Sequence, residues 1–175
     1  MKIEPIETPR LFLRSFRADD APFAMSVWND PEMGEYLPDE SVDTMTEEAR
    51  REYLAMLQTL GDDPECCYLI SEDKLTGERI GTCSFIPSPD GASYDIAYCV
   101  HKAFWCRGYA TEMAQGMVDY ARTQGAKRVT VLVGSENGPS NAVVRKLGFQ
   151  KVGEGTYRKR GTDLVMTDNH YELNL

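Results

Sequence analysis

The chain has few of the residues on which metal sites and disulfide frameworks depend. Its two histidines, His101 and His170, lie far apart and in no H-x-x-x-H or Cys/His pattern, so the sequence predicts no metal site. Its five cysteines include no C-x-x-C pair, and an odd, irregularly spaced set is unlike the framework of a secreted protein. We therefore expect reduced, mostly buried thiols at Cys66, Cys67, Cys83, Cys99 and Cys106.

Long apolar runs and an excess of positive charge are also missing. No apolar run approaches the roughly 18 to 20 residues that span a bilayer, and the first five residues, MKIEP, lack the apolar stretch of a signal peptide. The sequence therefore predicts a cytoplasmic protein that does not bind membranes. A formal net charge of −9 argues against a nucleic-acid-binding surface, which needs clustered Lys and Arg. The same charge modestly favours the approach of a cationic substrate, although acidic surfaces more often serve only solubility.

What is present is the composition of an ordinary globular domain. The 175 residues are 42% hydrophobic and 27% charged, and they include no internal repeat, low-complexity segment or linker. A chain of this length buries a core without help from disulfides or metals. We expect one domain over residues 1–175.

The first part of the chain predicts a strand followed by two helices. Alternating apolar residues indicate a strand over residues 10–16, and the DDAP sequence is a helix start signal for a helix that ends near residue 29. The stretch 34–43 is irregular and a candidate cover for a site. Helical spacing returns over residues 44–60.

The remaining elements alternate between strands and helices. Three strands separated by turn-rich stretches predict an antiparallel meander, over residues 66–71, 79–86 and 94–100. Later elements are expected at 108–123 (helix), 129–133 (strand), 139–146 (helix), 149–156 and 164–173 (strands). The order strand, helix, strand across residues 94–133 suggests a parallel crossover.

Residues 104–113, FWCRGYATEM, lie between a predicted strand and a predicted helix and suggest a cradle for an anion. A helix start leaves several backbone N–H groups unpaired, and the helix dipole favours negative charge there. Gly108 permits close approach of the backbone, Ala110 leaves room, and Arg107 adds a charge. By itself the local pattern leaves another reading open, in which the small residues only allow tight packing of helix on sheet.

This stretch resembles motif A of the GNAT acetyltransferases, R/Q-x-x-G-x-G/A, and particularly the W-G-K-G-Y-A-T-E form of the ribosomal-protein N-terminal acetyltransferase (Rim-type) branch. Trp105 stands at the R/Q position, which the branch shares, and Cys106 replaces the usual glycine. The resemblance implies acetyl-CoA as cosubstrate. It implies cofactor contacts from Trp105, Cys106, Arg107, Gly108, Tyr109, Ala110 and Thr111.

Two further segments are similar to the same family. NGPSNAVVRKLGF, residues 137–149, looks like the motif B element N-x-x-S…K-L-G-F, and ETPRLFLR, residues 7–14, looks like the E-T-x-R-L-x-L-R opening of the branch. The motif B resemblance implies contacts with the pantetheine arm around Asn137, and it adds Ser140, Asn141 and Arg145 to the cofactor-binding set. A purely structural interpretation of that segment, as a helix that begins at a proline and ends at Gly148, is compatible with a role in cofactor binding.

The resemblance also implies a fold and an activity. The fold is α/β, a single-domain GNAT fold with a mixed, mostly antiparallel sheet of about seven strands, splayed in the middle and flanked by about four helices. The activity is transfer of an acetyl group to a primary amine by direct attack on the thioester. The acceptor class stays open between protein N-termini, small amines such as polyamines or aminoglycosides, and amino-acid-like metabolites. Family analogy favours a monomer or homodimer.

Acetyl transfer needs a neutral amine, stabilisation of an oxyanion and a proton for the leaving thiolate. Asp95 occupies the place of the glutamate in the branch's E-I-G-Y-x-L strand, which implies a general base acting directly or through water. The alternative is an outward-facing carboxylate, and aspartate reaches less far than glutamate. The family's oxyanion donor is a backbone N–H at the end of this strand, here Cys99 or Val100, and its neighbours, including Tyr98, are expected to bind pantetheine amides.

The proton donor to the thiolate is less well marked. The tyrosine usual just before K-L-G-F is replaced by Val144, so Ser140 is the best remaining donor, unless it only caps the helix. Tyr98 and Tyr109 are weaker alternatives. A covalent acetyl-cysteine route through the cysteines beside the site lacks a histidine placed to activate them.

A runner-up function is a catalytically idle acyl-CoA-binding sensor or scaffold, which the departures from the family pattern keep open. A nucleotide enzyme is disfavoured because the chain has neither G-x-G-x-x-G nor G-x-x-x-x-G-K-[ST]. The acceptor-facing parts are expected in residues 34–43, in the second helix and in the last hairpin near 158–163. Tyr36 and Asp39 are candidates there without a spacing argument.

Overall fold

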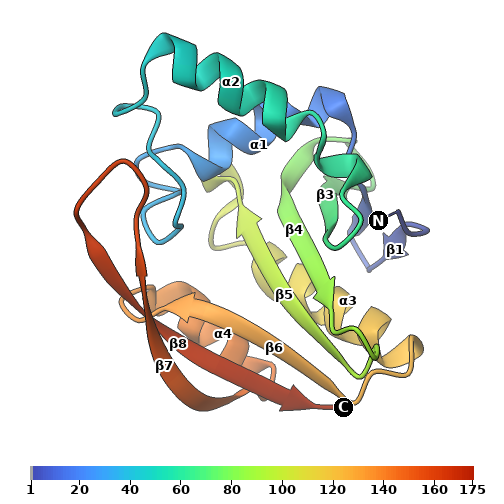
Figure 1. The fold of residues 1–175 in the computed structure, drawn as a ribbon. Coiled ribbons are helices and arrows are strands. Elements are labelled where there is room, and N and C mark those ends of the chain that lie inside the picture. Colours follow the sequence, from blue (N-terminus) through green and yellow to red (C-terminus); the bar gives the residue numbers. More distant parts are fainter. Residues whose placement is uncertain (1) are drawn as a thin grey trace.

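One eight-stranded mixed sheet organises the chain, with helices on both faces (Figure 1). The computed structural model describes residues 2–175. The strands are β1 (Ile6–Glu7), β2 (Leu11–Ser15), β3 (Cys67–Asp73), β4 (Arg79–Pro87), β5 (Ser93–Val100), β6 (Arg128–Gly134), β7 (Gln150–Arg158) and β8 (Val165–Asn174). The helices are α1 (Ala21–Trp28), α2 (Glu47–Leu57), α3 (Tyr109–Thr123) and α4 (Gly138–Lys146). Spatial order in the sheet is β1-β2-β3-β4-β5-β6-β8-β7.

The α/β fold class predicted from the sequence is confirmed, with one strand more than expected. The extra strand is β1, in which Ile6 lies opposite Leu13 of β2. Two residues are too few to show the alternation by which a strand is recognised in a sequence. Helix α2 begins at Glu47 rather than at residue 44, because the Thr46 hydroxyl accepts a hydrogen bond from the Ala49 N–H and caps the helix there.

The sheet splays in its middle, as the resemblance implied. Strands β5 and β6 are the parallel pair among the described neighbours, and their register covers only Ser93–Asp95 against Arg128–Thr130. Beyond this point β5 continues to Val100 and β6 to Gly134 without pairing. The two halves of the sheet therefore separate toward the carboxyl ends of β5 and β6.

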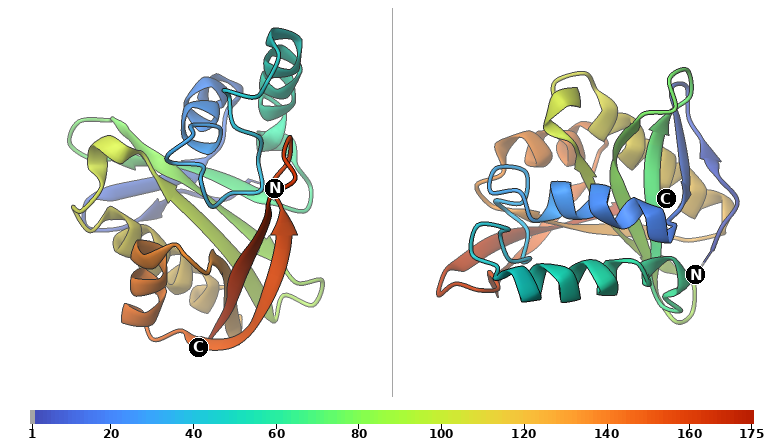
Figure 2. Two further views of the ribbon diagram at one scale, coloured as in Figure 1. Left: turned by 90° about the vertical axis from the view of Figure 1, so that its left-hand side faces the viewer. Right: turned by 90° about the horizontal axis from the view of Figure 1, so that it is seen from above.

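Two hydrophobic cores hold the layers together. Helices α3 and α4 cover one face of the sheet, and α1 and α2 lie on the other (Figure 2). The larger core, on the α3 side, includes Met113 and Met117, which are four residues apart on one helix face, packed with Leu69 of β3. The smaller core joins Phe16 and Leu57 to the next residue of β3, Ile70. Strand β3 is thus buried on both faces.

A buried ion cluster connects the start of α1 to the sheet. The Arg14 guanidinium contacts the fully buried Asp20 carboxylate at 2.7 Å and the Glu72 carboxylate at 2.5 Å. Arg79 Nε also pairs with Asp20 Oδ1 at 2.9 Å, so the fully buried Asp20 carboxylate has two arginine partners. None of the helices in residues 2–175 combines the length and apolar character that crossing a bilayer requires.

Candidate active site

The loop between β5 and α3 directs a set of free backbone N–H groups outward. Gly108 adopts the left-handed conformation, φ 79°, and is the N-cap residue of α3, while Cys106 has φ 60°. In the described chain, the N–H groups of residues 106–111 donate hydrogen bonds to no protein acceptor. Six unpaired donors at the positive end of a 15-residue helix fit a phosphate group. We call residues 104–109 the phosphate loop.

A clamp from the amino-terminal segment holds this loop. The Glu112 carboxylate accepts hydrogen bonds from the Thr8 hydroxyl at 2.6 Å, the Arg10 N–H at 2.7 Å and the Arg10 Nε at 2.6 Å. Arg10 Nη1 also donates to the Arg107 carbonyl at 3.0 Å. Because a trans peptide is planar, fixing that carbonyl turns the Gly108 N–H to the opposite side. The opening segment and the phosphate loop, about 100 residues apart in the sequence, are therefore in direct contact, which the sequence alone did not reveal.

Along β5, backbone groups point alternately toward β4 and toward β6, and those that point toward β6 beyond Asp95 face the gap between the two separated strands. The His101 N–H donates to the Ile80 carbonyl, so odd-numbered residues of β5 exchange hydrogen bonds with β4. The N–H and C=O groups of Cys99 consequently point toward β4. Those of Tyr98 and Val100 point toward β6, where the strands have separated. Of the two oxyanion donors considered, this geometry favours Val100.

Two side-chain hydrogen bonds border the gap. The Trp105 Nε1 donates to the Val100 carbonyl at 2.7 Å, and the hydroxyls of Tyr98 and Ser140 lie 3.0 Å apart, joining β5 to α4 across the gap. Burial raises the pKa of Tyr98 to about 12. The side chain that caps α4 is Asn137, whose Oδ1 accepts from the Ser140 N–H at 3.1 Å. The Ser140 hydroxyl is therefore not the cap.

The other predicted cofactor residues differ in accessibility. Asn141 is buried, and its amide bonds the Gly134 and Asn137 carbonyls while its oxygen accepts from Tyr171 and Asn169. These contacts make its side chain part of the frame that joins β6, α4 and β8. The exposed members of the set are Trp105, Cys106, Arg107, Gly108 and Arg145, and the half-buried ones are Tyr109, Ala110 and Thr111.

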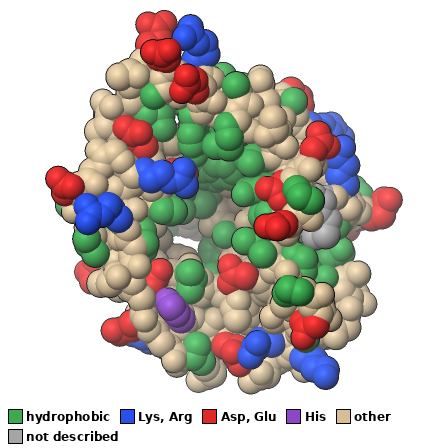
Figure 3. Space-filling model, viewed as in Figure 1, with side chains coloured by type: hydrophobic (Ala, Val, Ile, Leu, Met, Phe, Trp, Pro, Cys, Tyr) green, Lys and Arg blue, Asp and Glu red, His purple; other side chains and the backbone are tan. Residues whose placement is uncertain are grey.

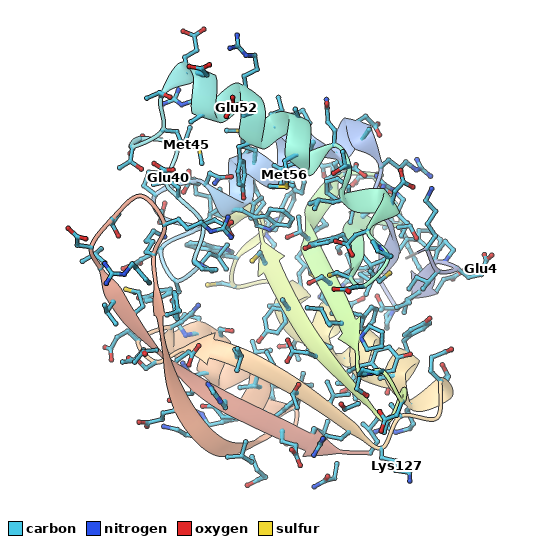
Figure 4. The ribbon with its side chains drawn as sticks, viewed as in Figure 1. Glu4, Glu40, Met45, Glu52, Met56 and Lys127 are labelled. Carbon is cyan, nitrogen blue, oxygen red and sulfur yellow. The ribbon has the colours of Figure 1, made fainter. Side chains whose placement is uncertain are left out.

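A cavity of about 460 Å³ opens on the opposite face of the sheet from α3. Figure 3 shows the molecule hollowed here, with apolar side chains around the hollow. Its floor is formed by β4 and β5, its roof by α1 and α2, and Met56 projects from α2 (Figure 4). It reaches Tyr98 and Cys99, so it meets the gap from the side away from the phosphate loop. Burial raises the pKa of the Cys99 thiol to about 12, which keeps this thiol protonated and argues against an acetyl-cysteine route.

Asp95 lies on the same face as this cavity but does not line it. It is the last residue of β5 that pairs with β6, and its carboxylate accepts a hydrogen bond from the Thr130 hydroxyl at 2.7 Å. Burial raises its pKa above the ordinary aspartate value despite that hydrogen bond. Because Asp95 does not line the cavity, a role as base there requires a bridging water.

The acceptor loop, residues 34–43, closes one side of the cavity and is fastened by the β7–β8 hairpin. The buried Lys159 ammonium donates to the carbonyls of Gly34 at 2.6 Å, Leu37 at 3.0 Å and Glu35 at 3.3 Å. Burial lowers the pKa of Lys159. Sequence analysis missed this residue, because a lysine in a polar turn carries no local sign of burial. The cavity lining includes Tyr53 and Met56 of α2 and Arg160 of the last hairpin, and the expectation that these parts face the acceptor stays a prediction.

Comparisons with known proteins agree with this geometry. The family model described as acetyltransferase (GNAT) domain matches residues 10–150. A protein of Bacillus licheniformis called uncharacterized N-acetyltransferase p20 is 31% identical over 155 residues, covering 86% of this chain and 85% of its own. A GNAT-family acetyltransferase structure from Bacillus anthracis superposes with a TM-score of 0.80 at 20% identity, covering 98% of both chains. The structure of a spermidine N-acetyltransferase from Vibrio cholerae, solved with CoA and spermine, gives 0.76 at 16% identity, covering 94% of this chain and 95% of that one.

Proposed function

The chain belongs to the GNAT acetyltransferase family, and on that premise we propose that it transfers acetyl from acetyl-CoA to a primary amine by direct attack. The observation that carries the proposal is the meeting of two sites at one gap. The phosphate loop offers its N–H groups on one side of the sheet, and the cavity opens on the other. Both reach the carboxyl end of β5, where the backbone N–H groups that face β6 have no strand partner because the two strands have separated.

The residues at the gap divide the chemistry among them. Acetyl-CoA supplies an activated thioester; as the amine nitrogen bonds to its carbonyl carbon, the carbon–sulfur bond breaks. The Val100 N–H is placed to stabilise negative charge on the carbonyl oxygen. The Ser140 hydroxyl is placed to protonate the departing sulfur, and the Tyr98 hydroxyl beside it can replace that proton. Asp95 receives the amine proton through water, and its raised pKa makes it a stronger base than an ordinary aspartate.

The wider assignments follow from the same proposal. Cofactor contacts are assigned to the phosphate loop, to Thr111 and to the start of α4 around Asn137, with exposed Arg145 available to an outer phosphate. We assign the protein to the cytoplasm and expect it to act as a monomer or homodimer on a protein N-terminus or a small amine.

Thermal unfolding with and without acetyl-CoA tests the proposal, with ATP and NAD as controls. A ligand at about 100 times its Kd contributes roughly 2.7 kcal/mol, which raises Tm by roughly 5–11 °C for a chain of this size. We expect only acetyl-CoA to give this shift, followed by amine-dependent thiol release. No shift at saturating acetyl-CoA contradicts the proposal, and a shift without thiol release from any amine identifies an idle sensor instead.

A further inference from the structure

The cavity contains one carboxylate, and that carboxylate is held in a fixed position. Among the residues that line the cavity, Asp39 is the single acid and Arg160 the single base. The Tyr53 hydroxyl donates to Asp39 Oδ1 at 2.9 Å. Burial first, and then the neighbouring Asp39 charge, raises the pKa of Tyr53, so this phenol remains a donor. The charge of Asp39 also adds to burial in raising the pKa of Cys99, which places the end of β5 within its field.

Aromatic rings surround this carboxylate. Trp28, Tyr53 and Tyr68 all line the cavity, and the rings of Trp28 and Tyr68 have centroids 6.2 Å apart. The Trp28 Nε1 donates a hydrogen bond to the Thr82 hydroxyl oxygen at 2.8 Å, which fixes the indole. Aromatic faces attract cations, and the attraction strengthens where water is excluded. A carboxylate among such rings is suited to a positively charged group.

The present partner of Asp39 is weakly held. Arg160 Nη2 lies 3.4 Å from Asp39 Oδ1, and the Arg160 side chain is 63% exposed whereas that of Asp39 is 19% exposed. An ion pair with one long contact and one exposed member contributes little. Other hydrogen bonds hold the turn that carries Arg160. The Lys159 ammonium donates to the Gly34 carbonyl at 2.6 Å, and the Arg160 N–H donates to the Pro38 carbonyl at 2.9 Å. The guanidinium can therefore move away while the turn stays in place.

We propose that Asp39 is the specificity residue of the acceptor site and that the acceptor is a small amine bearing a second cationic group, which displaces the Arg160 guanidinium. This inference rests on the proposed acetyltransferase function. The carboxylate lies inside the cavity and the guanidinium at its mouth, so an entering cation replaces one ion pair with a more buried one. A neutral tail would give Asp39 no charged partner in place of Arg160, and an acidic tail would be repelled by it. The volume of about 460 Å³ lies within the range of small-molecule sites.

Three amines that differ only at the far end of a four-carbon chain test this: 1,4-diaminobutane, n-butylamine and 4-aminobutyrate. In the wild type we expect kcat/KM for the diamine to exceed that of the other two by about tenfold or more, the discrimination of a charge-assisted contact. Asp39→Asn should abolish this preference, lowering kcat/KM for the diamine to about that of n-butylamine. Arg160→Gln should raise kcat/KM for the diamine a few-fold, because it removes the competing cation. Arg158→Gln is the matched control, since Arg158 pairs with Asp163 on the surface.

The opposite results overturn the inference. Preference for 4-aminobutyrate that is lost in Arg160→Gln would make Arg160 the reader of a carboxylate, and equal rates for all three amines would make the Asp39–Arg160 pair purely structural. If none is acetylated, thermal shift of the acetyl-CoA-bound protein by the diamine decides. A shift present in wild type and Tyr53→Phe but absent in Asp39→Asn supports the inference, and no shift refutes it. Failure of acetyl-CoA itself to bind would instead refute the proposed function.

Discussion

The two loops that border the gap are fastened by similar means but are specified differently. The phosphate loop is clamped by Glu112 and Arg10, and the acceptor loop is clamped by Lys159, each a charged side chain that reaches a segment about 100 residues away or more. In the phosphate loop the clamp secures a shape that local sequence already favours, a left-handed glycine before a helix. The acceptor loop has no regular structure and depends on its clamp for its shape.

This difference teaches where substrate selectivity can change. The phosphate loop presents backbone N–H groups, which every residue except proline supplies, so we expect replacement of a side chain such as Cys106 to have little effect on cofactor binding. The acceptor side presents the side chains of Asp39, Tyr53 and Arg160, brought together from three segments. We therefore expect substitution there to alter the preferred acceptor without changing the affinity for acetyl-CoA.

The largest expected effect comes from replacing Gly108 by valine. A β-branched residue is strained at φ 79°, although a Cβ there would meet only the Arg10 Nη2 at an ordinary 3.6 Å. Relief of that strain reorients the N–H groups, so we expect acetyl-CoA affinity to fall by about 100-fold or more, the loss of several charge-assisted hydrogen bonds. Calorimetric titration measures it. Gly91→Val is the control, because Gly91 has φ 68° in the turn before β5, at the other end of that strand from the phosphate loop, with nothing within 4 Å of its Cβ position; equal affinities in the two variants would remove the phosphate loop from the site.

A smaller, pH-dependent effect is expected from Asp95→Asn. Burial raises the pKa of Asp95, so its carboxylate form is lost as pH falls through that raised value, and the wild-type rate should fall with it. The variant has no carboxylate at this position, so its pH–rate profile should lack this fall. We expect kcat/KM for a small amine to drop by about 100-fold near pH 6 and to recover toward pH 10, where an amine of pKa about 10.4 begins to lose its proton unaided. The acetyl-CoA KM should not change. Parallel pH profiles for the two proteins would contradict the role of base.

The smallest effects are expected from removing the side chains that hold the two loops. These variants also test whether the cofactor side and the acceptor side are independent of each other. Arg10→Ala should raise the acetyl-CoA KM by about tenfold and spare the amine KM, because it frees the Arg107 carbonyl. Lys159→Met should raise the amine KM several-fold, spare the acetyl-CoA KM and lower Tm by about 2–6 °C, since three carbonyls lose a buried donor. Two-substrate steady-state kinetics measures both. Arg122→Ala on α3 is a surface control, and a parallel rise of both KM values in either variant would show that the two sides are coupled.

Much of the fold was predictable because strands and helices leave periodic patterns. All strands but β1 and helices α1 to α4 were expected near their observed positions, the strand–helix–strand order predicted the parallel crossover, and the family resemblance implied the splay. Within the site, the phosphate loop was predictable from Gly108 and the helix start that follows it. The choice of Val100 over Cys99 was not, because it depends on which β5 residues bond to β4.

By itself the sequence determined the local conformations: the left-handed turn at Gly108, the start of α3, the strands and the family to which they belong. These follow from steric limits and hydrogen bonds within a few residues. Only the tertiary structure decided the contacts between distant segments, such as Tyr98 with Ser140, 42 positions apart, and Lys159 with Gly34, 125 positions apart. Such contacts depend on strand register and layer packing, which sum many weak interactions over the whole chain and leave no mark at either residue.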